Sequence, residues 1–339
     1  MSVELEPNKD NNKRTLPVFS RYYNLFIWGT LAVVIAVAAK GILLTPHDLA
    51  NMTTSTIAGH EWQYNIYRLI AMGDAFSEGM PGRWVENFSF GWGYPLFQYT
   101  GPVPYTLGAL MLNVGFEPLA ALNFSWLAAY IGAGVAMFWA TRPIFGRWGA
   151  LLSTSCYLLA PYHLVDTYVR TNLVETSAFI FPPLILRALW IAIEQPRRAV
   201  VVGAIGVMLL PLTHMLSTYI VGLGLAVFTL AYLLALPNER RWPVMRAALL
   251  LAAFGLSLSA FFWLPALVDI TQVRGVEAIT AGFYSYDKHF VYPHQLISSN
   301  WYYGGSEQGP RDYMSFSLGA IILYAAVASG LLYRTAVVD

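Results

Sequence analysis

The chain has 339 residues, of which 57% are hydrophobic and 12% are charged, and its formal net charge is +1. Soluble domains carry roughly 25% charged residues, so this composition excludes an ordinary soluble enzyme. The near-neutral charge also argues against a nucleic-acid partner, because the chain has no basic stripe that would neutralise phosphates.

Apolar residues fall in blocks that are long enough to cross about 30 Å of hydrocarbon as helices. The predicted fold class is therefore all-α and integral to a membrane. The predicted spans, in chain order, are residues 24–44, 119–141, 148–162, 173–194, 198–213, 216–236, 246–268 and 316–334. The first span follows a polar N-terminus and lacks a small-residue cleavage site, which indicates a retained signal anchor.

A ninth apolar segment, residues 96–115, is not predicted to cross. Pro95, Pro102 and Pro104 interrupt its first turns, which favours a juxtamembrane or re-entrant helix. With about eight crossings, both chain ends are cytoplasmic and the basic loop clusters share the inner side, as the positive-inside rule requires. These clusters contain Arg142, Arg147, Arg197, Arg198, Arg240, Arg241, Arg246 and Arg334.

This topology divides the chain into a cytoplasmic tail (1–23), a transmembrane domain (24–334) and a cytoplasmic C-terminal end (335–339). Two long segments, 45–118 and 269–315, then lie outside and are predicted to enclose a cavity at the outer surface. The same topology places all six histidines at or near that face: His47, His60, His163, His214, His289 and His294. Nine carboxylates fall there too: Glu61, Asp74, Glu78, Glu86, Asp166, Glu175, Asp269, Glu277 and Asp287.

The first outer segment contains a predicted amphipathic helix that lies in the membrane interface. The apolar residues that recur there at helical spacing are Trp62, Ile66, Leu69, Ile70 and Phe76. Glu61, Asn65 and Arg68 share one face of this helix, and Glu61 is placed in the first turn, where the helix dipole favours an ionised carboxylate. Two readings stay open: Glu61 stabilises the helix end, or it acts as a general base.

A second constellation, PYHLVDTYVRTNLVE, lies at the predicted outer end of a crossing. In a helix, Asp166 and Arg170 are i, i+4 partners, with His163 on the same side and Glu175 following. Either the group is a solvated salt-bridged cap, or Arg170 binds a phosphate bidentately.

The remaining candidates carry weaker signals. His214 lies at the outer end of a crossing, where a histidine is either a packing residue or a functional group. Cys156 is the single cysteine, so the chain forms no disulfide or cysteine-based metal site within itself. Carboxylates and histidines are available outside, but no spacing defines a ligand set, so neither a metal nor another cofactor is assigned.

Taken together, the motifs GHEWQYNIYRLIAMGDAFSEGMPGRW, GWGYPLFQYTGPVPY, RPIFGRWGALLSTSCYLLAPYHLVDTYVRTNLVE, LTHMLST and FFWLPALVD resemble a bacterial and archaeal group of polytopic proteins. These are labelled 6-pyruvoyl-tetrahydropterin-synthase-related membrane proteins and are similar to the GT-C glycosyltransferase superfamily. The resemblance covers about residues 20 to 330. It implies a GT-C-like bundle in a bacterial or archaeal cell membrane, with juxtamembrane helices and an acidic catalytic residue in the first outer loop.

The resemblance implies an enzyme that transfers a sugar from a polyprenyl-phosphate carrier to an acceptor at the outer leaflet. The loop acid falls on Glu61, where relatives tend to show Asp, and Asn65 stands where a histidine is expected. The substrate-binding residues that it implies are Arg68, Arg83, Trp84, His163, Asp166, Arg170, Glu175 and His214. Implied partners are membrane lipids and the lipid-linked donor.

Two alternatives remain. A non-catalytic subunit would keep the fold and scaffold a larger membrane complex, since fold alone does not establish activity. A transporter ranks last, because its ionisable residues are expected at the bilayer midplane and not at the rim.

Overall fold

The computed structural model describes residues 17–43, 57–79, 83–273, 281–282, 285–311, 313–325 and 327. Across these ranges the regular structure is helical, and the only β pairing consists of two isolated bridges, Val85 with Tyr94 and Tyr303 with Met314. The predicted all-α class is thus confirmed for this part of the chain. The N-terminal tail to residue 16, His47, Glu277, Arg334 and residues 335–339 lie outside the described residues.

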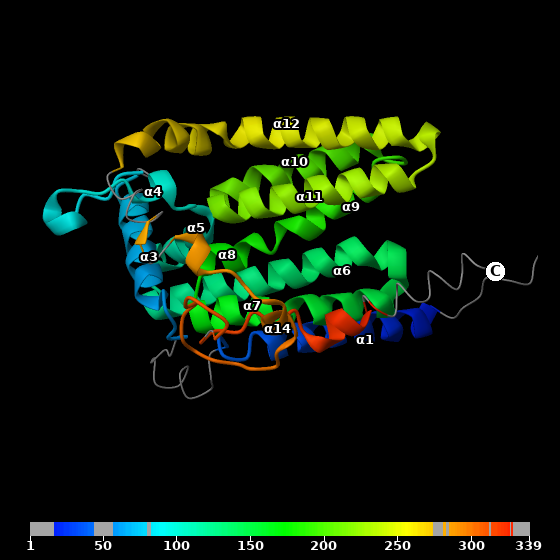
Figure 1. Cartoon of the computed structure of the whole chain (residues 1–339), viewed down its shortest axis with the longest axis horizontal. Coiled ribbons are helices and arrows are strands. Elements are labelled where there is room, and N and C mark those ends of the chain that lie inside the picture. The colour runs from blue at the N-terminus through cyan, green and yellow to red at the C-terminus, as the bar shows by residue number, and fades with distance from the viewer. Residues whose placement is uncertain are drawn as a thin grey trace, which may run out of the picture.

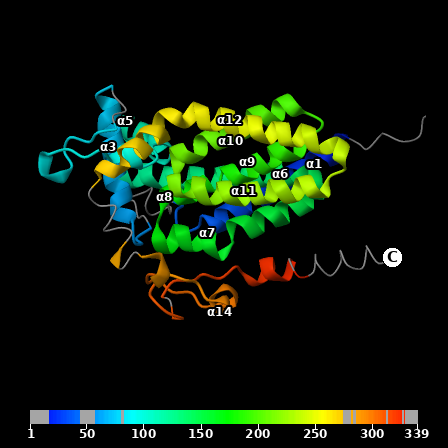
Figure 2. The same cartoon turned by 45° about the horizontal axis from the view of Figure 1, so that its top comes forward.

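Long helices run side by side along the long axis of the molecule and form a bundle (Figures 1 and 2). They are α1 (Pro17–Ala38), α6 (Pro118–Leu158), α9 (Phe181–Ile191), α10 (Pro196–Thr213), α11 (Met215–Ala235) and α12 (Asn238–Asp269), with the short α8 (Leu173–Ala178) preceding α9. Among the described residues, five stretches are long and apolar enough to cross a membrane: 118–158, 173–191, 196–213, 215–235 and 238–272. A shorter apolar helix covers Tyr22–Ala38. These helices support a membrane protein, while the count of eight crossings stays a prediction.

Helix α6 is a hairpin of two limbs that turns at Gly146. Gly146 has φ 68° and ψ −173°, a conformation that is essentially restricted to glycine. A Cβ atom built on Gly134 would lie 3.1 Å from Cδ1 of Leu158, although a continuous helix would separate these residues by about 36 Å at 1.5 Å per residue. The turn falls between the two spans predicted at 119–141 and 148–162.

Proline sets several helix starts and breaks the segment 96–115. Helices α6, α9 and α10 each carry proline at one of their first two positions, where its missing N–H costs no hydrogen bond. Residues 96–115 form two short helices, α4 (Leu96–Tyr99) and α5 (Val103–Asn113). Eleven residues of α5 span only about 16 Å, so neither helix by itself is long enough to cross, and the break lies where the prolines predicted it.

The predicted amphipathic helix is α3 (Trp62–Ser77), which runs across one end of the bundle (Figure 1). Its buried residues are Asn65, Leu69, Ala71, Met72 and Gly73, so the buried stripe is rotated from the predicted one. Trp62, Ile66 and Ile70 are only half-buried. We call this end of the bundle the α3 end.

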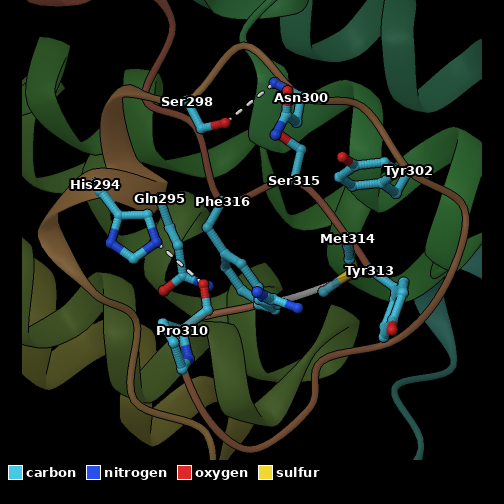
Figure 3. Close-up of a pocket in the computed structure, with 11 residues that line it drawn as sticks. His294, Gln295, Ser298, Asn300, Tyr302, Pro310, Tyr313, Met314, Ser315 and Phe316 are labelled. Carbon is cyan, nitrogen blue, oxygen red and sulfur yellow. Dashed lines mark hydrogen bonds between the residues drawn. The ribbon is translucent and has the colours of Figure 1, made fainter.

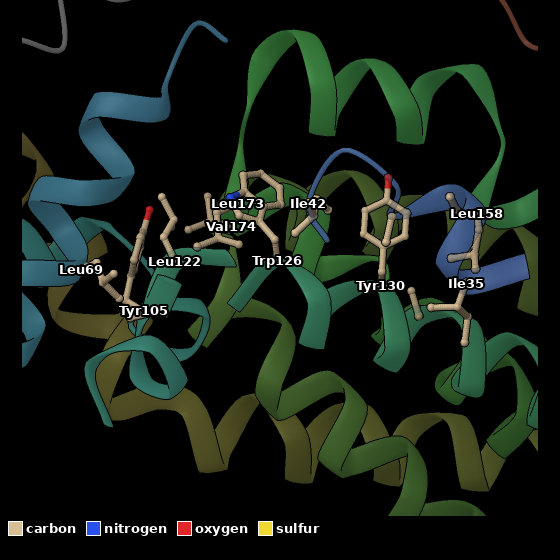
Figure 4. Packing of buried hydrophobic residues seen from close by; sticks show 14 of the residues in the cluster. Ile35, Ile42, Leu69, Tyr105, Leu122, Trp126, Tyr130, Leu158, Leu173 and Val174 are labelled. Carbon is tan, nitrogen blue, oxygen red and sulfur yellow. The ribbon is translucent and has the colours of Figure 1, made fainter. Parts of the chain in front are cut away.

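The main core lies between α1, α3, α5, α6 and α8 (Figure 4). Its largest fully buried side chains include Trp126, Tyr105 and Tyr130. Burial of such apolar surface stabilises by about 25 cal/mol per Å². Helix α11 differs, because no residue in its most apolar stretch of 18 residues is buried within the chain. Such exposure suits a helix that faces lipid.

Short elements complete the description. They are η1 (Ser89–Gly91), α7 (Pro161–Val165), the π-helical turn η2 (Asp166–Arg170), η3 (Ile270–Gln272), η5 (Tyr286–Lys288) and α14 (Pro293–Ile297).

Candidate active site

The loop between α7 and α8 has an irregular backbone that gathers its charged side chains. The π turn of η2 is followed by Thr171, a β-branched residue with left-handed dihedrals of φ 52° and ψ 45°. Asn172 then caps α8, because its Oδ1 accepts a hydrogen bond from the Glu175 amide at 3.1 Å. Strained residues and π turns concentrate at functional sites, so this loop is the first place to look for one.

Arg170 stands at the centre of this loop and binds two carboxylates. Its Nη1 lies 2.9 Å from Oδ1 of Asp166 and 2.7 Å from Oε2 of Glu175. Thr176 Oγ1 donates to the second oxygen of Asp166 at 2.9 Å, and the Tyr162 hydroxyl donates to Glu175. We call Glu61, Arg68, Asp166, Arg170 and Glu175 the Arg170 cluster.

Burial controls the charges of this cluster. Asp166 is fully buried, and desolvation together with the nearby Glu175 charge raises its pKa well above the ordinary value, against the opposite effect of Arg170. Desolvation lowers the pKa of Arg170. The charges of Asp166 and Glu175 outweigh this effect and raise the pKa of Arg170 above its ordinary value. Arg170 therefore stays protonated, and its positive charge stabilises the carboxylates of the cluster.

Glu61 joins the cluster from α3. Its backbone N–H donates to the Arg170 carbonyl and to Thr171 Oγ1, both at 3.0 Å. Its carboxylate accepts from Asn172 Nδ2 at 3.5 Å and lies 3.9 Å from Nη1 of Arg68. About a third of the side chain is exposed.

The predicted position of Glu61 in the first turn is wrong. Glu61 is the N-cap residue directly before α3, and no capping hydrogen bond stabilises its ionised carboxylate. Instead, desolvation raises its pKa above 4.5, and Arg68 and Arg170 only partly oppose this. The carboxylate is a stronger base than that of a free glutamate.

Asn65 connects three elements below Glu61. It is 1% exposed, its Nδ2 donates to the Thr171 carbonyl at 2.6 Å, and its Oδ1 accepts from the Tyr105 hydroxyl at 2.9 Å. Arg68 in turn donates to Tyr105 at 3.3 Å. The predicted common face of Glu61, Asn65 and Arg68 is confirmed.

The structure places the two histidines differently. His163 is fully buried, with its ring stacked on Phe179 at 4.1 Å and on Tyr130 at 4.9 Å, and burial lowers its pKa to about 4. His214 is half-buried and its Nδ1 lies 2.7 Å from Ser217 Oγ. Burial lowers the pKa of His214, and the charges of Glu175, Arg170 and Arg68 also act on it. His214 therefore borders the cluster, whereas His163 is a core residue.

Arg83 and Trp84 lie in a separate polar group. Arg83 donates to Gln98 Oε1 at 3.0 Å and to the Phe261 carbonyl, and Gln98 donates to Asp269 at 3.0 Å. Trp84 is 55% exposed and borders a cavity of about 420 Å³ together with Arg83 and Asp269. Within the described residues, no hydrogen bond or ion pair connects this group to the Arg170 cluster.

Several residues of the site were not expected from the sequence. Tyr105, Tyr162 and Thr176 contribute hydroxyls from three elements. Their spacing in the sequence does not indicate that these hydroxyls meet at one site. Asn172 was detectable, because Asn three residues before Glu at a helix start is a capping pattern. In the part of the chain that the structure describes, no group of three His, Cys, Asp or Glu side chains forms a metal-binding set.

The fold and site thus define an all-α protein with membrane-spanning candidates and a buried charge cluster at one end. Comparison of the chain with models of known families, with curated proteins and with solved structures found no match.

Proposed function

We propose that this chain is a membrane glycosyltransferase that transfers a sugar from a polyprenyl-phosphate-linked donor to an acceptor at the extracytoplasmic face. The observation that supports the proposal is Glu61, a partly exposed carboxylate with a raised pKa that lies 3.9 Å from Arg68 and is also affected by the charge of Arg170. A general base works best when its pKa is closer to the operating pH than that of an ordinary carboxylate.

In the proposed reaction Glu61 takes the proton from the acceptor hydroxyl. The acceptor oxygen attacks the anomeric carbon, the bond from that carbon to the phosphate oxygen breaks, and the configuration inverts. Polyprenyl phosphate leaves with the electron pair. Stabilisation of this developing negative charge supplies much of the rate in such reactions.

Arg68 is the better candidate to bind the phosphate. Within the described residues, its interactions are a 3.3 Å hydrogen bond to Tyr105, a 3.9 Å contact with Glu61 and a contact with the face of the Tyr64 ring at 5.8 Å. Both polar contacts use Nη1, so most of its five N–H donors are available. Arg170, by contrast, already binds two carboxylates at distances under 3 Å. Arg170 is therefore a positioning residue, because its carbonyl also holds the Glu61 amide.

The test is Glu61→Gln in the full chain, reconstituted in vesicles with a polyprenyl-phosphate sugar. We expect transfer to fall at least about a hundredfold, as for loss of a general base. Glu78→Gln is the matched control, because Glu78 is an exposed acid directly after the same helix, and it should leave transfer unchanged. Unimpaired transfer by Glu61→Gln would refute the base assignment.

A second function is favoured by the internal pairing of Arg170 and the complete burial of Asp166. Such a cluster also suits a non-catalytic subunit that scaffolds a membrane complex. Co-purification of the chain with a large assembly in fixed stoichiometry, combined with no effect of Glu61→Gln on any transfer, would support the subunit and contradict the enzyme.

A further inference from the structure

A second candidate site lies in the segment after α12, which folds back against the α3 end. Nε2 of His60, the neighbour of Glu61, lies 3.1 Å from the Tyr303 carbonyl. A Cβ atom on Gly319 would lie 2.9 Å from Pro161 Cδ, at the start of α7. The segment with α14 is set to one side of the bundle (Figure 2). This part of the chain is therefore next to the Arg170 cluster.

Local hydrogen bonds shape a cavity in this segment. A narrow hairpin is held by the Gly304 amide bonded to the Tyr313 carbonyl at 2.7 Å, and α14 is tied to the following chain by the Leu318 amide bonded to the Leu296 carbonyl at 2.9 Å. The cavity between α14 and the hairpin has a volume of about 270 Å³. Figure 3 shows side chains of both elements pointing toward it.

Among the described residues, the lining of this cavity is rich in polar groups and contains no carboxylate. The polar groups include Gln295, Ser298, Asn300, Tyr302, Arg311 and Ser315. Gln295 and Ser315 are each 7% exposed, so they are built into the wall. His294 lies at the rim, and its Nε2 donates to the Pro310 carbonyl at 3.0 Å, which leaves Nδ1 as an acceptor when the ring is neutral.

Arg311 gives the cavity its charge. In the described part of the chain the guanidinium of Arg311 forms no ion pair with an acidic side chain, whereas Arg68 and Arg170 both do. Arg311 is exposed, and a guanidinium that has no acidic partner among the described residues and lies among amides and hydroxyls matches an oxyanion that also carries hydroxyl groups. The volume lies slightly below the range of roughly 300–1,000 Å³ for sites of drug-sized ligands, and so suits one small ring.

We infer that this cavity binds a single sugar unit that carries an oxyanion, either a carboxylate or a phosphate. Arg311 binds the oxyanion, and the amide of Asn300 and the hydroxyl of Ser315 bind the ring hydroxyls. The aromatic faces of Tyr302 and Tyr313 border the unit. The assignment of this unit to the acceptor rests on the proposed function, in which Arg68 holds the donor phosphate.

Binding to the purified full chain in detergent tests the inference by isothermal titration calorimetry. The probes are glucuronate, glucose 1-phosphate, glucose, glucosamine and inorganic phosphate. Glucuronate or glucose 1-phosphate should bind at least tenfold more tightly than glucose and glucosamine. Equal or tighter binding of glucose or glucosamine would overturn the inference. Binding of inorganic phosphate as tight as that of both acidic sugars would also overturn it, because the cavity would then recognise the anion and not the sugar.

Variants locate the binding. Arg311→Gln should weaken the acidic sugar at least tenfold, and Asn300→Ala should weaken glucose 1-phosphate more than inorganic phosphate. Arg240→Gln changes an exposed arginine near the start of α12 and should have no effect. Unchanged binding by Arg311→Gln would overturn the inference.

Failure of the proposed function is distinguishable from failure of this site. Glu61→Gln should leave binding of the acidic sugar intact. If Glu61→Gln leaves transfer unimpaired but Arg311→Gln loses binding, the enzyme proposal fails and the site stands.

Discussion

At the residue scale, one cation binds both buried acids of the α3 end. The side chains of Asp166 and Glu175 are 0% and 11% exposed, and both are bound by Arg170. Removal of one partner of a buried ion pair leaves an uncompensated charge in a low dielectric, which costs more than the pair contributes. Arg170 is thus a structural requirement of the site as well as its centre.

Arg170→Met should lower the free energy of unfolding by about 3–5 kcal/mol. The change keeps the length of the side chain but leaves the carboxylates of Asp166 and Glu175 without their cation. Thermal unfolding of the purified chain in detergent, followed by tryptophan fluorescence, measures this loss of stability. Arg198→Met is the control, because Arg198 is exposed and, among the described residues, its side chain hydrogen-bonds to Gln195 alone. Equal shifts in the two variants would show that the cluster is not structurally required.

At the element scale, close backbone approaches hold α3 and the α7–α8 loop together. Gly59 has no room for a side chain, because a Cβ atom there would overlap the Val169 carbonyl and lie 2.7 Å from Thr171 Cγ2. The His60 amide donates to the same carbonyl at 3.0 Å. The position of Glu61 beside Arg170 therefore depends on a glycine two residues before it.

Gly59→Ala should destabilise the chain by about 1–3 kcal/mol, as overpacking does, and should also reduce transfer because Glu61 is displaced. Unfolding in detergent and the vesicle assay give the two readouts. Gly222→Ala in α11 is the matched control, because a Cβ atom there meets nothing within 4 Å and alanine favours the helix. Wild-type stability in Gly59→Ala would mean that this contact does not fix the loop.

At the scale of the whole molecule, the two ends of the bundle differ in chemistry. The α3 end holds the Arg170 cluster. The opposite end holds arginines near the turn of α6 and the starts of α10 and α12, and the Arg147 guanidinium lies 5.0 Å from the ring of Tyr23 in α1. This separation fits a chain whose basic loops face the cytoplasm.

Cysteine labelling tests that topology. In a Cys156→Ser background, Glu78→Cys and Arg240→Cys should react with a membrane-impermeant maleimide from opposite faces of the membrane, with Glu78→Cys reacting from outside. Both positions are exposed. Glu78 directly follows α3, which lies at one end of the bundle, and Arg240 is near the start of α12, at the other end (Figure 1). Labelling of both from one face would contradict the predicted crossings, and labelling of Arg240→Cys from outside would invert them.

The sequence alone determined the features that depend on local chemistry. Apolar block length predicted the long helices, proline predicted the broken segment 96–115, and the basic loops around residues 142–147 marked the turn at Gly146. Helical spacing placed Glu61 and Arg68 on one face, and the i, i+4 rule paired Asp166 with Arg170. These features need only neighbouring residues, so a linear pattern contains them.

Only the tertiary structure decided which of these groups are desolvated and which meet. It buried Asn65 under the Thr171 loop, enclosed His163 between aromatic rings, and set Arg83 and Trp84 apart from the Arg170 cluster. It also brought Tyr105 and Tyr162 to the site and placed Glu61 ahead of its helix. Burial and pKa depend on contacts between segments distant in the chain, and helical periodicity does not encode those contacts.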